Sequence, residues 1–293
     1  MNENFRRMPF GNPAVPAHMR IGFLGAGEIA QVLVDGILAN NLVDPDRIMA
    51  FSPMSGRHLL LRDKYGIAAA SSNAEVIENS DYIFSCMRSE QVAGALRQVR
   101  RCDFKDRALI SASSGTPIQV FESLLGDVAV VRSLPTYPSV VGEGAIAVSF
   151  NRLCSEEQKS GVMALFNPMG RCFILREDQI DAFTAVTCLP HFLQIFQAGV
   201  EGAVMMGLDL DTSRKIVMQT ARGALRMWEE KPDQLGEMLD RSATPGGITA
   251  RMLHYLDMHR FKDAIKGCVE EGTVRTRAFG ELIRRQLDRV DRA

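Results

Sequence analysis

The sequence predicts an α/β domain built on a parallel sheet, followed by an all-helical domain. Short apolar runs alternate with amphipathic segments up to about residue 175, and long helical patterns fill the rest of the chain. The third observation is a glycine-rich turn directly after the first apolar run. A chain of 293 residues suits two domains, since about 150 residues per domain is common.

The first half contains the strand candidates, apolar runs of four to five residues, several of which lack polar alternation. Such runs are typical of strands buried on both faces of a parallel sheet, and helical patterns between them predict βαβ units. The predicted strands are Arg20–Leu24, Ile48–Phe51, Tyr82–Cys86, Ala108–Ala112, Val128–Arg132, Ala145–Ser149 and Cys172–Leu175, and the predicted helices are Glu28–Ala39, Gly56–Tyr65, Glu90–Val99, Ile118–Leu125 and Glu156–Phe166.

The second half predicts helices only, at Gln179–Met206, Thr212–Glu230, Gln234–Leu239, Ile248–Asp257 and Phe261–Arg289. The first of these predicted helices is apolar on all sides. A helix of that kind is buried in a large core or between subunits. Because the helical half offers too little polar surface to cover it, we expect the chain to form an oligomer.

Residues 1–18 precede the first strand candidate and contain three prolines and no long apolar run. We expect a flexible extension there, and neither a signal peptide nor a membrane helix. No later stretch reaches the roughly 18 apolar residues that a membrane span needs, so association with a membrane is not expected.

Charge and cysteine content argue against two further classes of protein. Thirty-four Lys and Arg against 35 Asp and Glu give a net charge of −1, whereas proteins that bind nucleic acid usually have a basic excess. The six cysteines form no CxxC pair and have no histidine at ligand spacing, which disfavours a zinc site or a disulfide framework. We therefore expect no metal, no nucleic-acid partner and a reducing, cytoplasmic location.

The strongest local motif is the glycine-rich turn, Gly25-x-Gly27-x-x-Ala30, between the first strand and the first helix. Gly25 permits a tight turn, Gly27 lets the backbone approach a pyrophosphate, and Ala30 lets the helix pack on the strand. Free N–H groups at the helix start then bind the phosphates. The motif predicts a Rossmann-type dinucleotide-binding domain at 19–176, and the helical patterns that follow predict an all-α domain at 177–293. A tight turn without a ligand is the alternative.

The end of the second predicted strand favours NADP over NAD. A site for NAD usually has Asp or Glu about 20 residues after the glycines. Here the strand is followed by Ser52, Pro53 and Arg57, without an acid. Ser52 and Ser55 can hydrogen-bond a 2′-phosphate and Arg57 can pair with it, so we predict NADP (NADPH) as the cofactor, with NAD less favoured. The alternative is that Arg57 belongs to a solvated helical turn.

The order of five motifs resembles the pyrroline-5-carboxylate reductases. The motifs are IGFLGAGEIA, FSP, VVRSLPTYPSVVGEGAIAV, TPGGITARML and VRTRAF, and the likeness extends from about Met19 to Leu282. The resemblance implies a Rossmann domain and an all-helical domain whose long helices interlock two subunits. It also implies NAD(P)H-dependent reduction of a cyclic imine to an amino acid by a homodimer or a larger homo-oligomer.

Matching the family's motifs residue by residue implies the cofactor-binding residues. Arg88-Ser89 stands where the family usually has Lys-Pro, and Thr136 replaces an Asn, so these contacts are altered. Glu28 replaces a neutral residue, and its carboxylate disfavours a close phosphate unless it points away. The cofactor-binding residues that we expect are Gly25, Gly27, Glu28, Ile29, Ala30, Ser52, Arg57, Met87, Arg88, Ser113 and Pro135.

The resemblance also implies a loop that holds the substrate's carboxylate and ring nitrogen, formed by Thr244, Gly246, Gly247 and Thr249. Such a turn at a helix start suits anion binding, and a turn that only caps the helix is the alternative. Where the family has Ser-Gly-Ser-Gly-Pro-Ala-Tyr, this chain has the bulkier segment from Val186 to Phe192. We therefore expect a changed substrate pocket.

Imine reduction needs little from side chains, because a protonated iminium is already electrophilic and mainly has to be placed against the nicotinamide. Thr249 is one catalytic candidate, since its hydroxyl could orient the nitrogen. His191 is the other, since an imidazole could donate a proton; a histidine that only packs or caps is its alternative.

The leading hypothesis is an NADPH-dependent reductase of a C=N bond in a small carboxylated substrate. One alternative is an NADP-dependent oxidoreductase of another substrate, such as a hydroxy acid. The other is a non-catalytic dinucleotide-binding protein whose pocket has decayed. The sequence leaves the identity of the substrate open.

Overall fold

The computed structural model describes residues 15–16, 18–53, 56–231 and 234–290. It divides into two compact units: the sheet unit, described over 15–187 and 271–290, and the helical unit, described over 188–270. The expected limits, 19–176 and 177–293, lie elsewhere, since helix α7 (Ile180–Thr187) and the last part of helix α12 (Phe261–Val290) belong to the sheet unit. Residues 1–14 and 17 of the expected extension lie outside the described residues.

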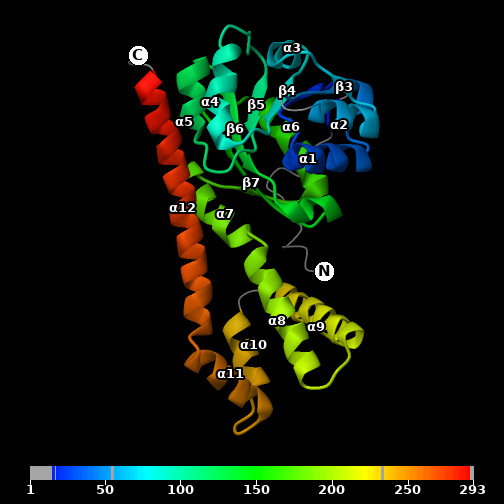
Figure 1. Cartoon of the computed structure of the whole chain (residues 1–293), viewed down its shortest axis with the longest axis vertical. Coiled ribbons are helices and arrows are strands. Elements are labelled where there is room, and N and C mark those ends of the chain that lie inside the picture. Colours follow the sequence, from blue (N-terminus) through cyan, green and yellow to red (C-terminus); the bar gives the residue numbers. More distant parts are fainter. Residues whose placement is uncertain (1–14, 17, 54–55, 232–233, 291–293) are drawn as a thin grey trace. The chain divides into compact units, whose positions relative to one another are not determined.

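An eight-stranded sheet forms the centre of the sheet unit (Figure 1). Its strand order is β3-β2-β1-β4-β5-β6-β7-β8, and each neighbouring pair is parallel except β6 and β7. The seven predicted strands are confirmed, with ends shifted by up to two residues, and β3 is an unpredicted strand of two residues. The bounds are β1 Ile21–Leu24, β2 Ile48–Phe51, β3 Ala68–Ala69, β4 Tyr82–Ser85, β5 Ala108–Ser111, β6 Ala129–Leu134, β7 Gly144–Phe150 and β8 Gly170–Ile174.

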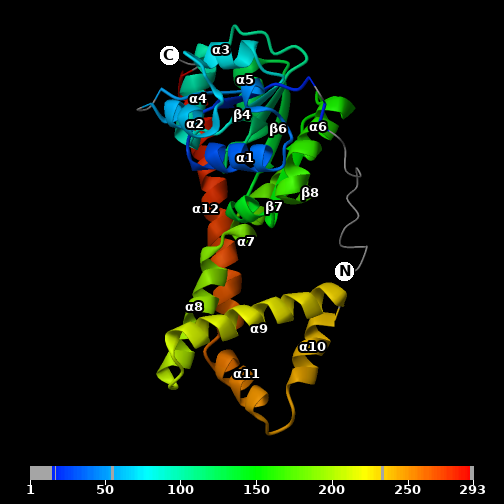
Figure 2. The same ribbon diagram turned by 90° about the vertical axis from the view of Figure 1, so that its right-hand side faces the viewer.

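Helices cover both faces of this sheet, because alternate side chains of each buried strand point to opposite faces (Figures 1 and 2). One apolar layer includes α1, α2 and α6, and the other includes α3, α4, α5 and Ile283 of α12. Helix α3 was not predicted, and the Ser72 hydroxyl caps it by accepting a hydrogen bond from the Glu75 N–H. The bounds are α1 Glu28–Ala39, α2 Arg57–Tyr65, α3 Asn73–Glu78, α4 Ser89–Gln98, α5 Ile118–Leu125 and α6 Glu156–Phe166.

The helical unit contains α8 to α11 and the first part of α12. The single predicted helix Gln179–Met206 is wrong: it is divided into a 3-10 turn (Glu177–Gln179), α7 and α8. The division falls at Pro190, which has no N–H to continue the helical hydrogen bonds. The bounds are α8 Pro190–Met205, α9 Leu210–Glu230, α10 Leu235–Ser242 and α11 Ile248–Met258.

These helices have almost no core of their own. Figure 2 shows α9, α10 and α11 following one another along three sides of a triangle. Among the described residues, α8, α10 and α11 contain none that is buried, and Met205 and Met206 are 78% and 81% exposed. The apolar surface expected on α8 is therefore uncovered in the single chain. Within the described part of the chain, no helix combines the length and apolarity that crossing a membrane requires.

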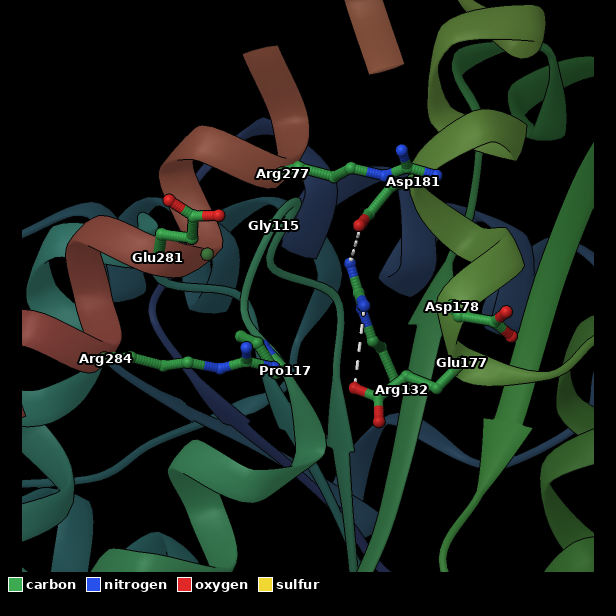
Figure 3. Close-up of a pocket in the computed structure, with 10 residues that line it drawn as sticks. Gly115, Pro117, Arg132, Glu177, Asp178, Asp181, Arg277, Glu281 and Arg284 are labelled. Carbon is green, nitrogen blue, oxygen red and sulfur yellow. Dashed lines mark hydrogen bonds and ion pairs between the residues drawn. The ribbon is translucent and has the colours of Figure 1, made fainter. Parts of the chain in front are cut away.

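Arg132 of β6 explains why α7 belongs to the sheet unit. Its guanidinium lies 2.7 Å from the Asp181 carboxylate of α7 and 3.5 Å from Glu177, while the side chain is only 5% exposed (Figure 3). Glu177 also accepts a hydrogen bond of 2.7 Å from the N–H of Ile118, at the start of α5. Two carboxylates thus join the sheet, α5 and α7 around one buried cation.

The last part of α12 is fixed by close backbone packing. A Cβ at Gly280 would lie 2.9 Å from the carbonyl oxygen of Gly115, so only glycine lets the helix approach this loop. Gly115 has a φ of +74°, which favours glycine at the same crossing. Three charged side chains spaced over two turns of the helix, Arg277, Glu281 and Arg284, then face a cavity of about 390 Å³ that Arg132 also lines (Figure 3).

We predict that Asp181→Ala lowers the free energy of unfolding by about 3 kcal/mol, because it leaves the buried Arg132 with only the longer Glu177 contact. Urea denaturation checks this value. Lys215→Ala is the control, since it removes an exposed ion pair of 2.6 Å and should cost less than about 0.5 kcal/mol. Equal losses for the two variants would contradict a special role for the buried pair.

Candidate active site

A tight turn joins β1 to α1 at the carboxyl end of the sheet. Gly25 has a φ of +97°, and a Cβ there would lie 3.0 Å from the carbonyl oxygen of Cys86. A Cβ at Gly27, directly before α1, would meet no atom within 4 Å, so this side of the turn is open. The N–H groups of the first turn of α1 are therefore free to bind an anion that enters from this side.

The turn borders a cavity of about 680 Å³. The loops after β1, β2, β4, β5 and β6 line it, and β1 lies between β2 and β4, where the strand order reverses. Such a reversal opens a crevice at the carboxyl ends of the strands. Ten predicted cofactor residues line the cavity: Gly25, Gly27, Glu28, Ile29, Ser52, Arg57, Met87, Arg88, Ser113 and Pro135.

Ala30 is the eleventh predicted residue, and the structure does not place it on the cavity wall. It is fully buried in the apolar layer beneath α1. Its small side chain therefore serves the packing of helix on strand, as the glycine-rich motif predicts, and does not itself contact a ligand.

The charges around the cavity favour an anionic ligand. Arg57 begins α2, and its neighbour Gly56 has a φ of +65°, which turns the chain into that helix. Arg88 precedes α4, and Glu28 is the one acidic residue among those that line the cavity. Glu28 is exposed, so its carboxylate is free to point into solvent. Beside Ser52 the described wall has no acid that would exclude a 2′-phosphate.

Asn73 is a wall residue that the sequence did not reveal. It begins α3, is only 6% exposed, and its Oδ1 has no hydrogen-bond partner among the described residues. A buried amide oxygen without a partner is costly, so this atom is suited to accept from a ligand in the cavity. The signal in the sequence was weak, because β3 and α3 are too short to show periodicity.

Cys86 also lines the cavity, and its burial raises the pKa of the thiol far above its ordinary value. The thiol therefore stays neutral at physiological pH and is no nucleophile. Among the described residues, no group of three His, Cys, Asp or Glu side chains could hold a metal ion.

The predicted substrate loop lies in the helical unit, before α11. Gly246 has a φ of +72°, and the N–H of Gly247 donates to the carbonyl oxygen of Thr244 at 2.9 Å. A Cβ at Gly247 would meet the Thr244 hydroxyl and lie 3.0 Å from the Thr244 carbonyl oxygen, so this position leaves little room for a side chain. Thr249 follows in the first turn of α11, where free N–H groups favour a carboxylate.

His191 is the second residue of α8, half-buried, with its ring centroid 4.3 Å from that of Phe192. No hydrogen bond to a described residue fixes its tautomer. The predicted substrate-binding and catalytic residues thus all belong to the helical unit, whereas the predicted cofactor residues all belong to the sheet unit.

Two family models match the chain, one in each half. The NADP oxidoreductase, coenzyme F420-dependent, model matches residues 20–115, and the pyrroline-5-carboxylate reductase dimerisation model matches residues 177–279. The first match contains the glycine-rich turn, and the second contains α8 to α11 and the predicted substrate loop.

Similar proteins cover nearly the whole chain. Pyrroline-5-carboxylate reductase 3 of Danio rerio is 29% identical over 89% of this chain and 92% of its own length. Pyrroline-5-carboxylate reductase of Escherichia coli is 26% identical over 84% of this chain and 93% of its own length.

A solved structure has the same fold: the pyrroline carboxylate reductase of Plasmodium falciparum with NADP bound. It superposes with a TM-score of 0.82 at 24% identity, over 90% of this chain and 99% of that one. The dimerisation-model match and the relatives support the pyrroline-5-carboxylate reductase family for this chain, and the solved structure shows the same fold.

Proposed function

We propose that the protein is an NADPH-dependent reductase of the C=N bond of a small carboxylated cyclic imine, of the pyrroline-5-carboxylate type used in proline biosynthesis. The observation that carries this proposal is the cavity at the strand-order reversal, with a glycine turn, an open helix start and no acid beside Ser52. The names of the relatives support the same chemistry.

The residues of the cavity fit a phosphorylated dinucleotide. Gly25 and Gly27 let the backbone N–H groups at the start of α1 reach the pyrophosphate. Ser52 and Arg57 hold the 2′-phosphate, and the unpartnered Oδ1 of Asn73 accepts from the adenosine portion. Met87, Arg88, Ser113 and Pro135 complete the lining of the cavity. The NADP-bound relative supports this assignment.

The loop before α11 binds the substrate in this proposal. The N–H groups that follow Gly246 and Gly247 hold its carboxylate, and the Thr249 hydroxyl hydrogen-bonds the ring nitrogen and orients the imine carbon. The cofactor, when bound, supplies the hydride. We assign His191 as the proton donor, since an imidazole N–H can donate a proton to a substrate nitrogen.

We further propose that the working protein is a homodimer joined by the C-terminal helices. The match to a dimerisation model supports self-association. The uncovered apolar side chains of α8 and α9, among them Leu193, Met205 and Met218, supply the surface that a second copy would bury.

We also propose a cytoplasmic location. The free thiols of all six cysteines support a reducing, cytoplasmic setting.

Purified protein should oxidise NADPH only when pyrroline-5-carboxylate is added, as absorbance of the reduced nicotinamide reports. Thr249→Ala should lower kcat/KM for the imine by about ten- to hundredfold, because it removes a hydrogen bond to the reacting nitrogen. Thr249→Ser keeps the hydroxyl and should retain most of the activity. Wild-type protein that binds NADPH but reduces no imine would refute the proposed reaction.

Arg57→Ala should weaken NADPH binding by about tenfold and leave NADH binding unchanged, because only NADPH carries the 2′-phosphate. Fluorescence titration with each nucleotide measures both constants. Arg62→Ala is the matched control, since Arg62 lies in the same helix and pairs with Asp63 at 2.8 Å. Equal losses for NADPH and NADH would contradict the assignment of Arg57.

Light scattering coupled to size-exclusion chromatography should give a dimer or a larger assembly for the wild type. Leu193→Glu should weaken self-association by at least about tenfold, because a carboxylate would be buried in the interface. Gln194→Glu adds the same charge at the neighbouring position of α8 and tests whether charge alone is responsible. A wild-type monomer would contradict the dimer proposal.

A further inference from the structure

Two loops form one wall of the dinucleotide cavity. The first follows β4 and leads into α4 at Ser89, and the second follows β5 and contains residues 112–117. Cys86, Met87 and Arg88 of the first and residues 112–114 of the second line the cavity. Their strands are joined by the parallel ladder of the sheet, whose last bond runs from the N–H of Ala112 to the carbonyl oxygen of Ser85. Beyond that bond, no backbone–backbone hydrogen bond joins the two loops within the described residues.

Three hydroxyl groups connect the loops instead. Ser89 Oγ donates to the carbonyl oxygen of Ser114 at 2.6 Å, and Thr116 Oγ1 donates to Ser89 Oγ at 3.2 Å. In the other direction, Ser113 Oγ donates to the carbonyl oxygen of Met87 at 2.7 Å. Each loop therefore both donates to and accepts from the other, and we name this set the hydroxyl clamp.

Two of the three hydroxyl-bearing residues of the clamp are buried, whereas Ser89 is half-buried and its bond to Ser114 is exposed. Ser113 is 4% exposed and Thr116 is fully buried, so an unpaired hydroxyl at either position would be costly. Ser89 is the link in the middle, since it accepts from Thr116 and donates to Ser114. Arg88 and Pro117, which precede α4 and α5, make no side-chain capping bond. The far end of the second loop is held by Glu177 and by α12, so the hydroxyl clamp is what ties that loop to the first.

We propose that Ser89 is a positioning residue that fixes the distance between the two wall loops, so that the cavity is preformed for the dinucleotide. This inference rests on the proposed function of the cavity as an NADPH site. When the loops are already held in place, NADPH binding does not carry the entropic cost of ordering them. This saving in binding free energy is the same in the ground state and in the transition state for hydride transfer. The clamp therefore acts on cofactor affinity and leaves the chemical step unchanged.

The test uses the full-length protein and measures the NADPH dissociation constant by fluorescence titration, together with KM and kcat. Ser89→Ala should raise both the dissociation constant and KM for NADPH by about three- to tenfold, with kcat within about twofold of wild type. Ser89→Thr keeps a hydroxyl at the same place and should restore both constants.

Ser89→Pro provides a second variant that does not depend on how well the alanine variant folds. Arg88 has a φ of −64° and a ψ of 146°, the conformation that suits a residue before proline, and Ser89 is the first residue of α4. Proline therefore fits the backbone and removes only the hydroxyl and an N–H without a helical partner. It should weaken NADPH binding as Ser89→Ala does.

Ser155→Ala is the matched control for general loss of stability. Ser155 caps α6 by accepting from the N–H of Gln158 at 3.1 Å, and it lies outside the cavity. Its removal should lower the melting temperature by about 2–4 °C while leaving the NADPH constant unchanged.

Three outcomes would overturn the inference. Wild-type affinity in both Ser89→Ala and Ser89→Pro would show that the hydroxyl does not position the wall, and the proposed function would stand. A loss of NADPH affinity in Ser155→Ala equal to that in Ser89→Ala would show that the weaker binding comes from lower stability alone. A wild-type protein that binds no NADPH would refute the proposed function, and this inference with it.

Discussion

The turn between β1 and α1 is the constraint on which the candidate site depends. Gly25 takes a left-handed backbone conformation against the carbonyl oxygen of Cys86, so the chain passes from strand to helix without a side chain in the way. The open start of α1 then lies beside the loops that follow β2, β4, β5 and β6. A larger residue at position 25 would strain this backbone conformation and press on the carbonyl group of Cys86 in the β4 loop.

Apolar burial holds the sheet, whereas polar networks hold the loops around its carboxyl edge. The backbone hydrogen bonds between neighbouring strands cannot fix the loops, because these bonds end where the strands end and the loops begin. On one side the hydroxyls of Ser89 and Ser113 join two loops, and on the other Arg132 joins β6 to α7 through Asp181. The buried Ser113 and Arg132 are costly unless their partners are in place, so the networks favour one arrangement of the edge.

Much of the site could be predicted because its signals are local. Apolar runs predicted the seven longer strands, and parallel strands bring their carboxyl ends to one edge, so ten of the predicted cofactor residues line one cavity. Asn73 was missed because β3 and α3 are too short to show a period. The break at Pro190 had a signal in the sequence, but the apolar pattern on both sides of it favoured one continuous helix.

The sequence by itself determined the order of elements, the need for glycine at position 25 and the two-part organisation of a reductase-type chain. Backbone preference and periodicity are properties of neighbouring residues, and they can be read along the chain. Only the tertiary structure decided that Ser89 bonds a residue 25 positions away and that Arg132 pairs with one 49 positions away. Such pairs depend on strand order and on how far each loop extends, which local preference does not specify.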